Sequence, residues 1–190
     1  MEDYRQSEEY NRYFALHGWI VERAGSSVAN IKKIPFLGSV IKIKKCPKDI
    51  DLSLVESLAK KYRSALIKIE VDINLEDAHY EDLEKQFHIN GYSDSCLAYC
   101  PTKTSYIDLT RSEEDILLSF DTEVRKEIKK NENTGIVVKS AESIEDIYPL
   151  IKYAGKSRHF IFQQIKDWKC QWEAFNKKAK VLLAYEGSNV

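Results

Sequence analysis

The sequence predicts a mixed α/β (α+β) protein, because of its composition and the order of its periodic segments. It has 190 residues, of which 43% are hydrophobic and 31% charged. That is enough apolar material to bury a sizeable core. Strand patterns cluster early in the chain, and helix and strand patterns alternate afterwards. We therefore expect layers of helices packed on a mixed sheet.

The predicted helices are marked by capping side chains and by apolar residues at helical spacing. Ser7, Ser112 and Ser143 are placed as N-cap residues, and Asp115 completes a capping box with Ser112. Pro149 lies inside one predicted helix, where it removes a backbone hydrogen bond. The predicted helices span 7–17, 51–62, 78–88, 112–120, 121–133, 143–158 and 166–176.

The predicted strands are short runs in which apolar side chains alternate with charged ones. Ile67 and Ile69, for example, alternate with Lys68 and Glu70. Pro35–Gly38 is a turn signal between two of the runs. The predicted strands span 19–23, 27–33, 39–45, 66–71, 105–109, 136–139 and 180–185.

The chain is predicted to contain two half-similar units, residues 1–105 and 106–190. The last predicted strand leads into a turn signal at 186–189, and the sequence stops one residue later. We therefore expect the second unit to be incomplete and the chain to be a fragment. An incomplete sheet has an unpaired edge, which predicts self-association through that edge.

Composition excludes several classes of protein. The net charge is -1, so the chain lacks the overall basic excess of a nucleic-acid-binding protein. No apolar run is long enough to cross a bilayer, and the acidic N-terminus does not resemble a secretory signal. The four cysteines lack the spacing of a zinc site. These features favour a soluble intracellular protein with reduced thiols and no metal.

Charge is unevenly distributed along the chain. Cations dominate residues 12–48, whereas acids dominate residues 70–94. The basic segment is suited to binding phosphate. The alternative is that these lysines are solvated strand edges that discourage edge pairing.

No sequence motif identifies a catalytic centre. The chain has no P-loop, GxGxxG, GxSxG, HExxH or EF-hand pattern. Its four histidines are scattered, and no Ser, Cys or Thr has a base at a recognisable spacing. Composition and spacing alone predict an α/β protein of undetermined activity.

Two basic segments are candidate anion sites. Arg125 and Lys129 lie, with Lys126 and Lys130, within one arc of a predicted helix, which suits phosphate in a nucleotide, a lipid diphosphate or RNA. A solvated helix face is the alternative. Arg158, with Lys166 and Trp168 close behind, could clamp an anion and stack a ring. Cations that offset a helix dipole are the alternative there.

Several stretches together resemble the FemAB-type aminoacyltransferases. The most specific similar stretch begins with Thr104-Ser105-Tyr106-Ile107-Asp108-Leu109-Thr110. It continues through the acidic start of the next predicted helix to Arg125, Ile128–Lys130 and Gly135–Val138. Gln6-Ser7-Glu8-Glu9-Tyr10 is similar to the family's "Q-S-x-x-W" start. Weaker similarities are His88–Tyr92, Ser157–Phe160 and Glu186–Gly187.

The resemblance implies two N-acetyltransferase-like (GNAT) units that need no cofactor. It implies transfer of an amino acid from aminoacyl-tRNA to an amine on a peptidoglycan-precursor peptide. It also implies work in the cytoplasm, at the inner face of the membrane. The alternatives are a non-catalytic GNAT-like binding module and an acyltransferase with a different amine acceptor.

The chain departs from the family pattern at residues that the resemblance assigns to substrate binding. A family Lys that binds diphosphate falls on Phe14, and Arg12 is the nearest cation in sequence. A family Arg falls on Gln164, for which Arg158 or Lys166 could substitute, whereas the aromatic at Trp168 is retained. A family Lys near the reaction centre would lie beyond residue 190. The resemblance thus nominates five substrate-binding residues. These are Arg12, Arg158, Gln164, Lys166 and Trp168.

Overall fold

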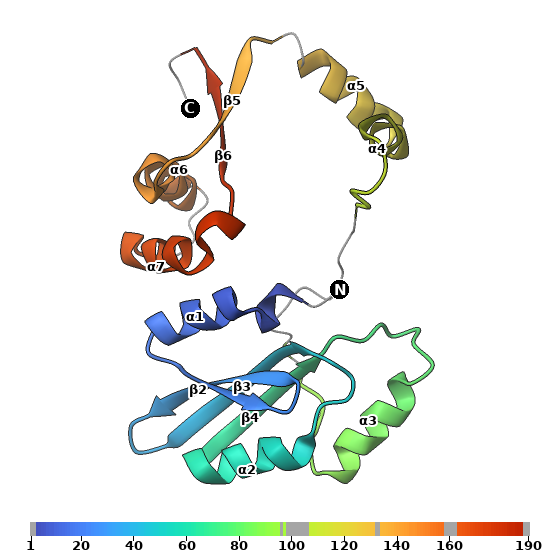
Figure 1. The fold of residues 1–190 in the computed structure, drawn as a ribbon, viewed down its shortest axis with the longest axis vertical. Helices are drawn as coiled ribbons and strands as arrows, with labels where there is room; N and C mark the ends of the chain where they lie inside the picture. Colours follow the sequence, from blue (N-terminus) through green and yellow to red (C-terminus); the bar gives the residue numbers. More distant parts are fainter. Residues whose placement is uncertain (1–2, 96, 98–106, 132–133, 158–162, 188–190) are drawn as a thin grey trace. The chain divides into compact units, whose positions relative to one another are not determined.

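The computed structural model describes residues 3–95, 97, 107–131, 134–157 and 163–187 (Figure 1). The chain divides into two compact units. Unit 1 comprises Met1–Pro101 with Lys169–Asn176, and unit 2 comprises Thr102–Trp168 with Lys177–Val190. Helices accompany a sheet in each unit, which confirms the expected α/β (α+β) class. None of the helices in the described ranges has the length and apolar character to span a bilayer.

Unit 1 is built on a four-stranded mixed sheet in the order β1-β2-β3-β4. Its first two pairings are antiparallel, and β3 pairs with β4 in parallel. A parallel pair needs a crossover, which the helix α2 supplies between β3 and β4. The strands are β1 (Ile20–Ala24), β2 (Ser27–Ile34), β3 (Gly38–Cys46) and β4 (Ser64–Val71).

One face of this sheet forms the hydrophobic core. Ile31, Ile41 and Ile43 are fully buried and belong to one cluster with Val55 and Leu58 of α2 (Leu52–Tyr62). Helix α3 (Tyr80–Ile89) adds Phe87, which is partly buried against the same cluster. Alternation along β2 and β3 places every second side chain on this face, so the apolar residues of the pattern form the core.

The opposite face is covered by α1 (Glu8–Leu16) and the 3-10 turn η1 (Tyr4–Gln6) (Figure 1). The predicted cap is present, because Ser7 Oγ accepts a hydrogen bond from the Tyr10 N–H at 3.3 Å. Gly18 follows the helix with a φ of 70°, a conformation that favours glycine. The predicted helix 7–17 is therefore confirmed at both ends.

Unit 2 contains helices and the antiparallel pair β5–β6. Ser112 Oγ accepts from the Asp115 N–H at 3.1 Å, which confirms Ser112 as the N-cap. The Asp115 carboxylate accepts from the Ser112 hydroxyl at 2.8 Å rather than from the Ser112 N–H, so only half of the predicted capping box is present. All five residues of β5 are exposed in the described structure, and few unit 2 side chains are buried. The elements are α4 (Glu113–Ser119), α5 (Thr122–Asn131), β5 (Ile136–Ser140), α6 (Ile144–Ser157) and β6 (Leu182–Glu186), with α7 (Ile165–Phe175) and η2 (Asn176–Lys178) spanning the unit boundary.

One predicted strand, 105–109, is wrong over its described part; residues 105 and 106 lie outside the described residues. Ile107 and Asp108 form no regular structure, and Leu109 lies in a turn. Asp108 Oδ1 accepts hydrogen bonds from the N–H and hydroxyl of Thr110, at 3.0 and 2.7 Å. This local turn competes with strand pairing, as aspartate side chains often do.

The cap of α2 gives a prediction about pH. Asp51 Oδ1 accepts bonds from the Ser53 hydroxyl and from the N–H groups of Leu54 and Ser53, which hold the pKa of Asp51 below its ordinary 3.8. We expect Asp51→Ala to lower the melting temperature by about 2–4 °C at pH 7, and Asp51→Asn to lower it less.

A lowered folded-state pKa means that the charged cap stabilises the fold above the ordinary carboxyl pKa. This contribution is lost as pH falls through the folded-state pKa. The wild-type advantage over Asp51→Ala, measured by thermal circular dichroism, should therefore shrink between pH 5 and pH 3. An advantage that stays constant over that range would contradict the assignment.

Candidate functional site

The face of the unit 1 sheet opposite the core is polar. Lys42 and Lys44 of β3 alternate with the buried Ile41 and Ile43, and Asn30 of β2 pairs with Lys42 in the register. A sheet face with lysines and an asparagine would normally be left to water. Here η1 and α1 lie on it, so its polar groups must find partners within unit 1.

Gln6 fastens the N-terminal segment to this polar face. Its Oε1 accepts a hydrogen bond from the Val28 N–H at 2.7 Å, and its Nε2 donates to the Lys44 carbonyl oxygen. The side chain thus bridges β2 and β3, and Gln6 is buried. This contact is the physical role of the first residue in the "Q-S" stretch of the sequence.

Asn11 continues the same network one helical turn later. Its Nδ2 donates to the Ser7 carbonyl at 2.7 Å and to the Gln6 carbonyl at 3.2 Å. Its Oδ1 accepts from Asn30 Nδ2 at 3.0 Å. Gln6, Asn11 and Asn30 are all buried, and their bonds satisfy polar groups that would otherwise destabilise the fold.

Three aromatic and two lysine side chains meet where α1 packs on this face, and we call them the lysine–aromatic cluster. The Lys44 ammonium donates to the Tyr10 hydroxyl at 2.7 Å and lies 4.8 Å from the centre of the Phe14 ring. The Lys42 ammonium lies 5.2 Å from the centre of the Trp19 ring. The two cations are half-buried against aromatic faces, which stabilises them and weakens their screening by salt. The cluster consists of Tyr10, Phe14, Trp19, Lys42 and Lys44.

This cluster bears on the departure at Phe14. Phe14 is 9% exposed and packs on Tyr10 and Trp19, with ring centres 5.0 and 5.1 Å apart, so it is a packing residue. The cation beside it is Lys44, which comes from a different element. Arg12, the nearest cation in sequence, is exposed on α1 and lines a depression with Val21 and Val28 of the first two strands.

Sequence reasoning missed Lys44 because the decisive fact is the placement of α1. Alternation in β3 showed that Lys42 and Lys44 share a face. Nothing in the pattern showed that the first helix covers that face, or that Tyr10 and Phe14 meet Lys44 there.

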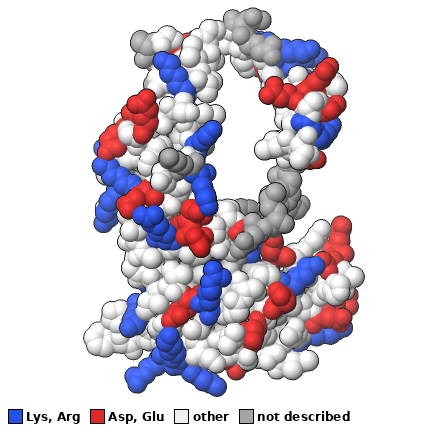
Figure 2. Space-filling model, viewed as in Figure 1, with Lys and Arg blue, Asp and Glu red and all other residues white. Residues whose placement is uncertain are grey.

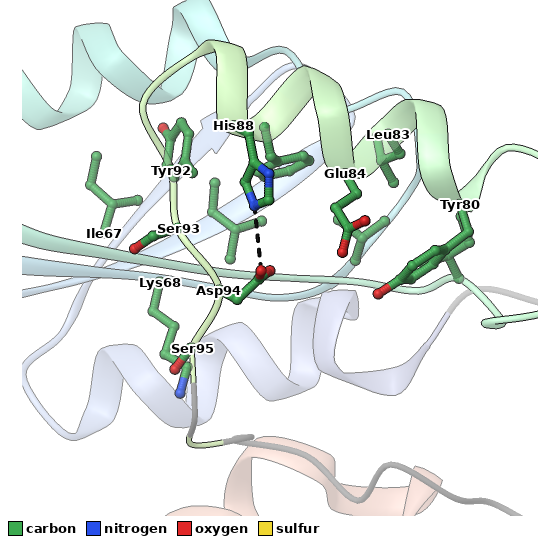
Figure 3. A pocket seen from close by; sticks show the side chains of 14 residues that line it. Ile67, Lys68, Tyr80, Leu83, Glu84, His88, Tyr92, Ser93, Asp94 and Ser95 are labelled. Atoms are coloured by element: carbon green, nitrogen blue, oxygen red, sulfur yellow. Dashed lines mark ion pairs between the residues drawn. The ribbon is translucent and has the colours of Figure 1, made fainter.

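Unit 1 also contains a cavity of about 320 Å³ between β4 and α3 (Figure 3). Apolar side chains such as Ile67 and Leu83 line it together with Glu84. His88 Nε2 lies 3.4 Å from Asp94 Oδ2 across it, and both side chains are exposed. His88 is thus in the last turn of α3, and Asp94 lies within ion-pair distance of it.

In unit 2, Arg125 and Lys129 lie on α5 as expected. The Arg125 guanidinium donates to the Leu118 carbonyl at 2.8 Å and to the Thr122 hydroxyl at 3.0 Å. These bonds join the end of α4 to the start of α5. Lys129 is exposed in the last turn of its helix. A phosphate or tRNA contact by either residue stays a prediction.

The remaining candidates lie at the start of α7, except Arg158, which is outside the described residues. The Gln164 carbonyl accepts from the Asp167 N–H at 2.9 Å, so Gln164 immediately precedes α7 and accepts a bond from its first turn. Lys166 is exposed, and Trp168 is half-buried. Trp168 Nε1 is buried and has no acceptor among the described residues. Their substrate-binding role stays a prediction.

Of the two described cysteines, Cys46 is excluded as a nucleophile by its environment. Cys46 is fully buried in the core, and burial raises the pKa of its thiol to about 12. A thiol in that environment remains protonated and unreactive. Cys170 is half-buried, and Cys96 and Cys100 lie outside the described residues.

Comparison with known proteins decides the family. The FemAB family model matches residues 67–187, more than half of the sequence. The chain belongs to the FemAB family. The crystal structure of FemX has a similar fold, with a TM-score of 0.70 at 18% identity over 96% of this chain. No curated protein matches significantly in sequence.

This chain spans about half of FemX, because the similarity covers 52% of the FemX chain. The lysine–aromatic cluster precedes residue 67 and so lies outside the match to the FemAB model. Coverage of 96% of the chain nevertheless brings most of unit 1 within the FemX-like fold. Fold similarity at this identity does not transfer substrate-binding residues, which must be judged from their own geometry.

The Gln6 bridge gives a prediction about stability. Gln6→Leu keeps the side-chain volume but leaves the Val28 N–H and the Lys44 carbonyl without their partner. We expect a loss of about 2–3 kcal/mol in the free energy of unfolding, measured by urea denaturation. The matched control is Gln86→Leu on the exposed surface of α3, which should change stability little. Equal effects of the two substitutions would show that the bridge does not fasten α1.

Proposed function

We propose that this chain is part of an aminoacyltransferase that acts in the cytoplasm, on a peptidoglycan precursor. The observation that carries the proposal is the FemAB match over residues 67–187, and the FemX-like fold supports it. The proposed organisation is a first GNAT-like unit, residues 1–105, followed by the first part of a second, residues 106–190.

The proposed reaction is attack of an amine on the ester of aminoacyl-tRNA. The amine nitrogen forms a C–N bond with the ester carbonyl, the C–O bond breaks, and the tRNA hydroxyl leaves with a proton. This chemistry needs no redox cofactor. It needs a site that holds the anionic precursor in place, since orientation supplies much of the rate enhancement in such reactions.

We place the precursor's diphosphate at the lysine–aromatic cluster. Lys44 lies beside Phe14, the position at which the resemblance expects a diphosphate-binding Lys. Lys42 lies two residues away on the same face, with its Cα about 7 Å along the strand. Two half-buried ammonium groups at that spacing suit an anion with two phosphates. In this proposal the cation has moved from α1 to β3, and the charge at the site is kept.

The test of this placement is a substitution that removes one charge. Lys44→Gln should weaken binding of a nucleoside-diphosphate-linked peptidoglycan precursor at least about tenfold by calorimetry, because a charge-assisted contact is lost. Lys44→Arg should retain most of the affinity. The control is Lys85→Gln on α3, in the acidic segment, which should leave affinity unchanged. Unchanged binding by Lys44→Gln, with the fold intact, would remove the cluster from the site.

Two other functions remain as alternatives. A non-catalytic binding module is favoured by Phe14 and Gln164, which occupy positions where the resemblance expects cations. An acyltransferase with another amine acceptor would keep the fold and change the acceptor. Transfer of a labelled amino acid from aminoacyl-tRNA to the precursor, by the complete gene product, supports our proposal. No transfer to any amine supports the binding module, and transfer only to other amines supports the second alternative.

A further inference from the structure

The turn between β2 and β3 projects the most exposed large apolar side chain in the described structure. Phe36 is 106% exposed and its neighbour Leu37 is 68% exposed. A single exposed apolar residue is ordinary on a protein surface. Two adjacent large ones at the tip of a hairpin, following Pro35, are unusual and call for a physical reason.

The backbone holds this turn in one conformation. Gly38 has a φ of 89°, and a Cβ there would lie 2.0 Å from the Arg63 carbonyl oxygen. The Leu37 N–H donates to the Ile34 carbonyl at 3.2 Å, and the Ser39 N–H donates to Arg63 O at 3.3 Å. The turn is therefore fixed against the end of α2. Its apolar tip is held out in solvent by the same contacts that close the hairpin.

Phe36 itself has a φ of 65°, in the left-handed region that bulky residues rarely adopt. Asparagine or glycine would fit this position with less strain. A strained backbone at a fully exposed aromatic residue is a departure from the local rules that sequences otherwise follow. Such departures concentrate at functional sites.

The apolar tip is bordered by cations. Lys33 is exposed beside the turn on β2, and Arg63 lies against Gly38; both line the same hollow as Phe36. Lys60 is exposed one helical turn before Arg63 on α2. None of these three has an acidic side chain within 4.0 Å among the residues that the structure describes. Figure 2 shows uncharged surface at the turn end of this hairpin, at the lower left, with Lys and Arg side chains next to it.

We propose that this basic apolar turn, Lys33–Gly38 with Arg63, inserts into the surface of an anionic lipid bilayer. An apolar side chain that projects beyond its own backbone can enter the interfacial layer, and neighbouring cations are then drawn to the headgroups. Charge complementarity thus selects an anionic bilayer as the occupant. The proposal involves no catalytic step and stands whether or not the proposed function does.

The turn combines two signals for membrane binding, an apolar side chain and a group of cations. One aromatic ring contributes apolar burial, and each cation near an anionic surface strengthens the partitioning about fivefold. Neither signal anchors a protein by itself. Together they predict weak, salt-sensitive association that depends on both residue types.

The test is co-sedimentation of the protein with vesicles of phosphatidylcholine alone or mixed with phosphatidylglycerol. We expect binding only to the mixed vesicles, and weaker binding at high salt. Phe36→Asn, which suits the left-handed backbone, should lower the partition coefficient about tenfold. Lys33→Gln combined with Arg63→Asn should lower it by a similar or larger factor.

Matched controls separate this turn from general surface effects. Leu75→Ser removes another exposed apolar residue, 76% exposed and followed by Glu76 and Asp77, and should not change binding. Lys85→Gln removes a cation from the acidic segment and should not change it either. Circular dichroism of each variant verifies that the fold is intact.

Three results would overturn the proposal. The first is no binding to the mixed vesicles, and the second is equal binding by wild type and Phe36→Asn. The third is self-association, seen by light scattering without lipid, that Phe36→Asn abolishes. This last result would assign the turn to contact with a second copy of the chain.

Discussion

The architecture of unit 1 depends on one buried carboxamide. Gln6 accepts from the β2 backbone and donates to the β3 backbone, so the segment before α1 is tied to two strands at once. A buried hydrogen bond of this kind adds little net stability while it is present. Its loss costs more, because it leaves a buried donor or acceptor without a partner. Without Gln6, a backbone N–H and a carbonyl under the helix would lack partners, and α1 would lose its registration on the sheet.

That registration explains why lysines can occupy a covered sheet face. Lys32 donates to the carbonyls of His17 and Gly18 at the end of α1, at 3.0 and 3.2 Å. Lys44 reaches the Tyr10 hydroxyl and lies over the Phe14 ring. Each cation is compensated by a helix end or an aromatic face, as long lysine stems allow. The sheet therefore has an apolar face that forms the core and a basic face whose cations are held by α1 and its aromatic side chains.

The spacing of apolar residues and the capping residues predicted most helices and strands of this fold. The features that were not predicted depend on contacts between segments far apart in the sequence. The alternation in β3 and the caps at Ser7 and Ser112 depend on neighbours in sequence, and all three are confirmed. The strand expected at 105–109 failed because Asp108 forms a local turn with Thr110, a competition that apolar periodicity does not register. The contacts of Lys44 could not be predicted because its neighbours Tyr10 and Phe14 come from α1, thirty or more residues earlier in the chain.

The exposed turn follows from the geometry of the crossover rather than from the hairpin alone. Arg63 ends α2 in the left-handed conformation, with φ 49°, and its carbonyl takes the Ser39 N–H. Ser39 and Ser64 share a hydroxyl–hydroxyl hydrogen bond of 2.6 Å at the first step of the parallel β3–β4 pairing. The end of the helix, the start of two strands and the turn thus meet at one point, where only glycine fits at residue 38. Because this junction fixes the path of the chain on both sides, the direction in which Phe36 projects is set by the core topology and cannot relax independently of it.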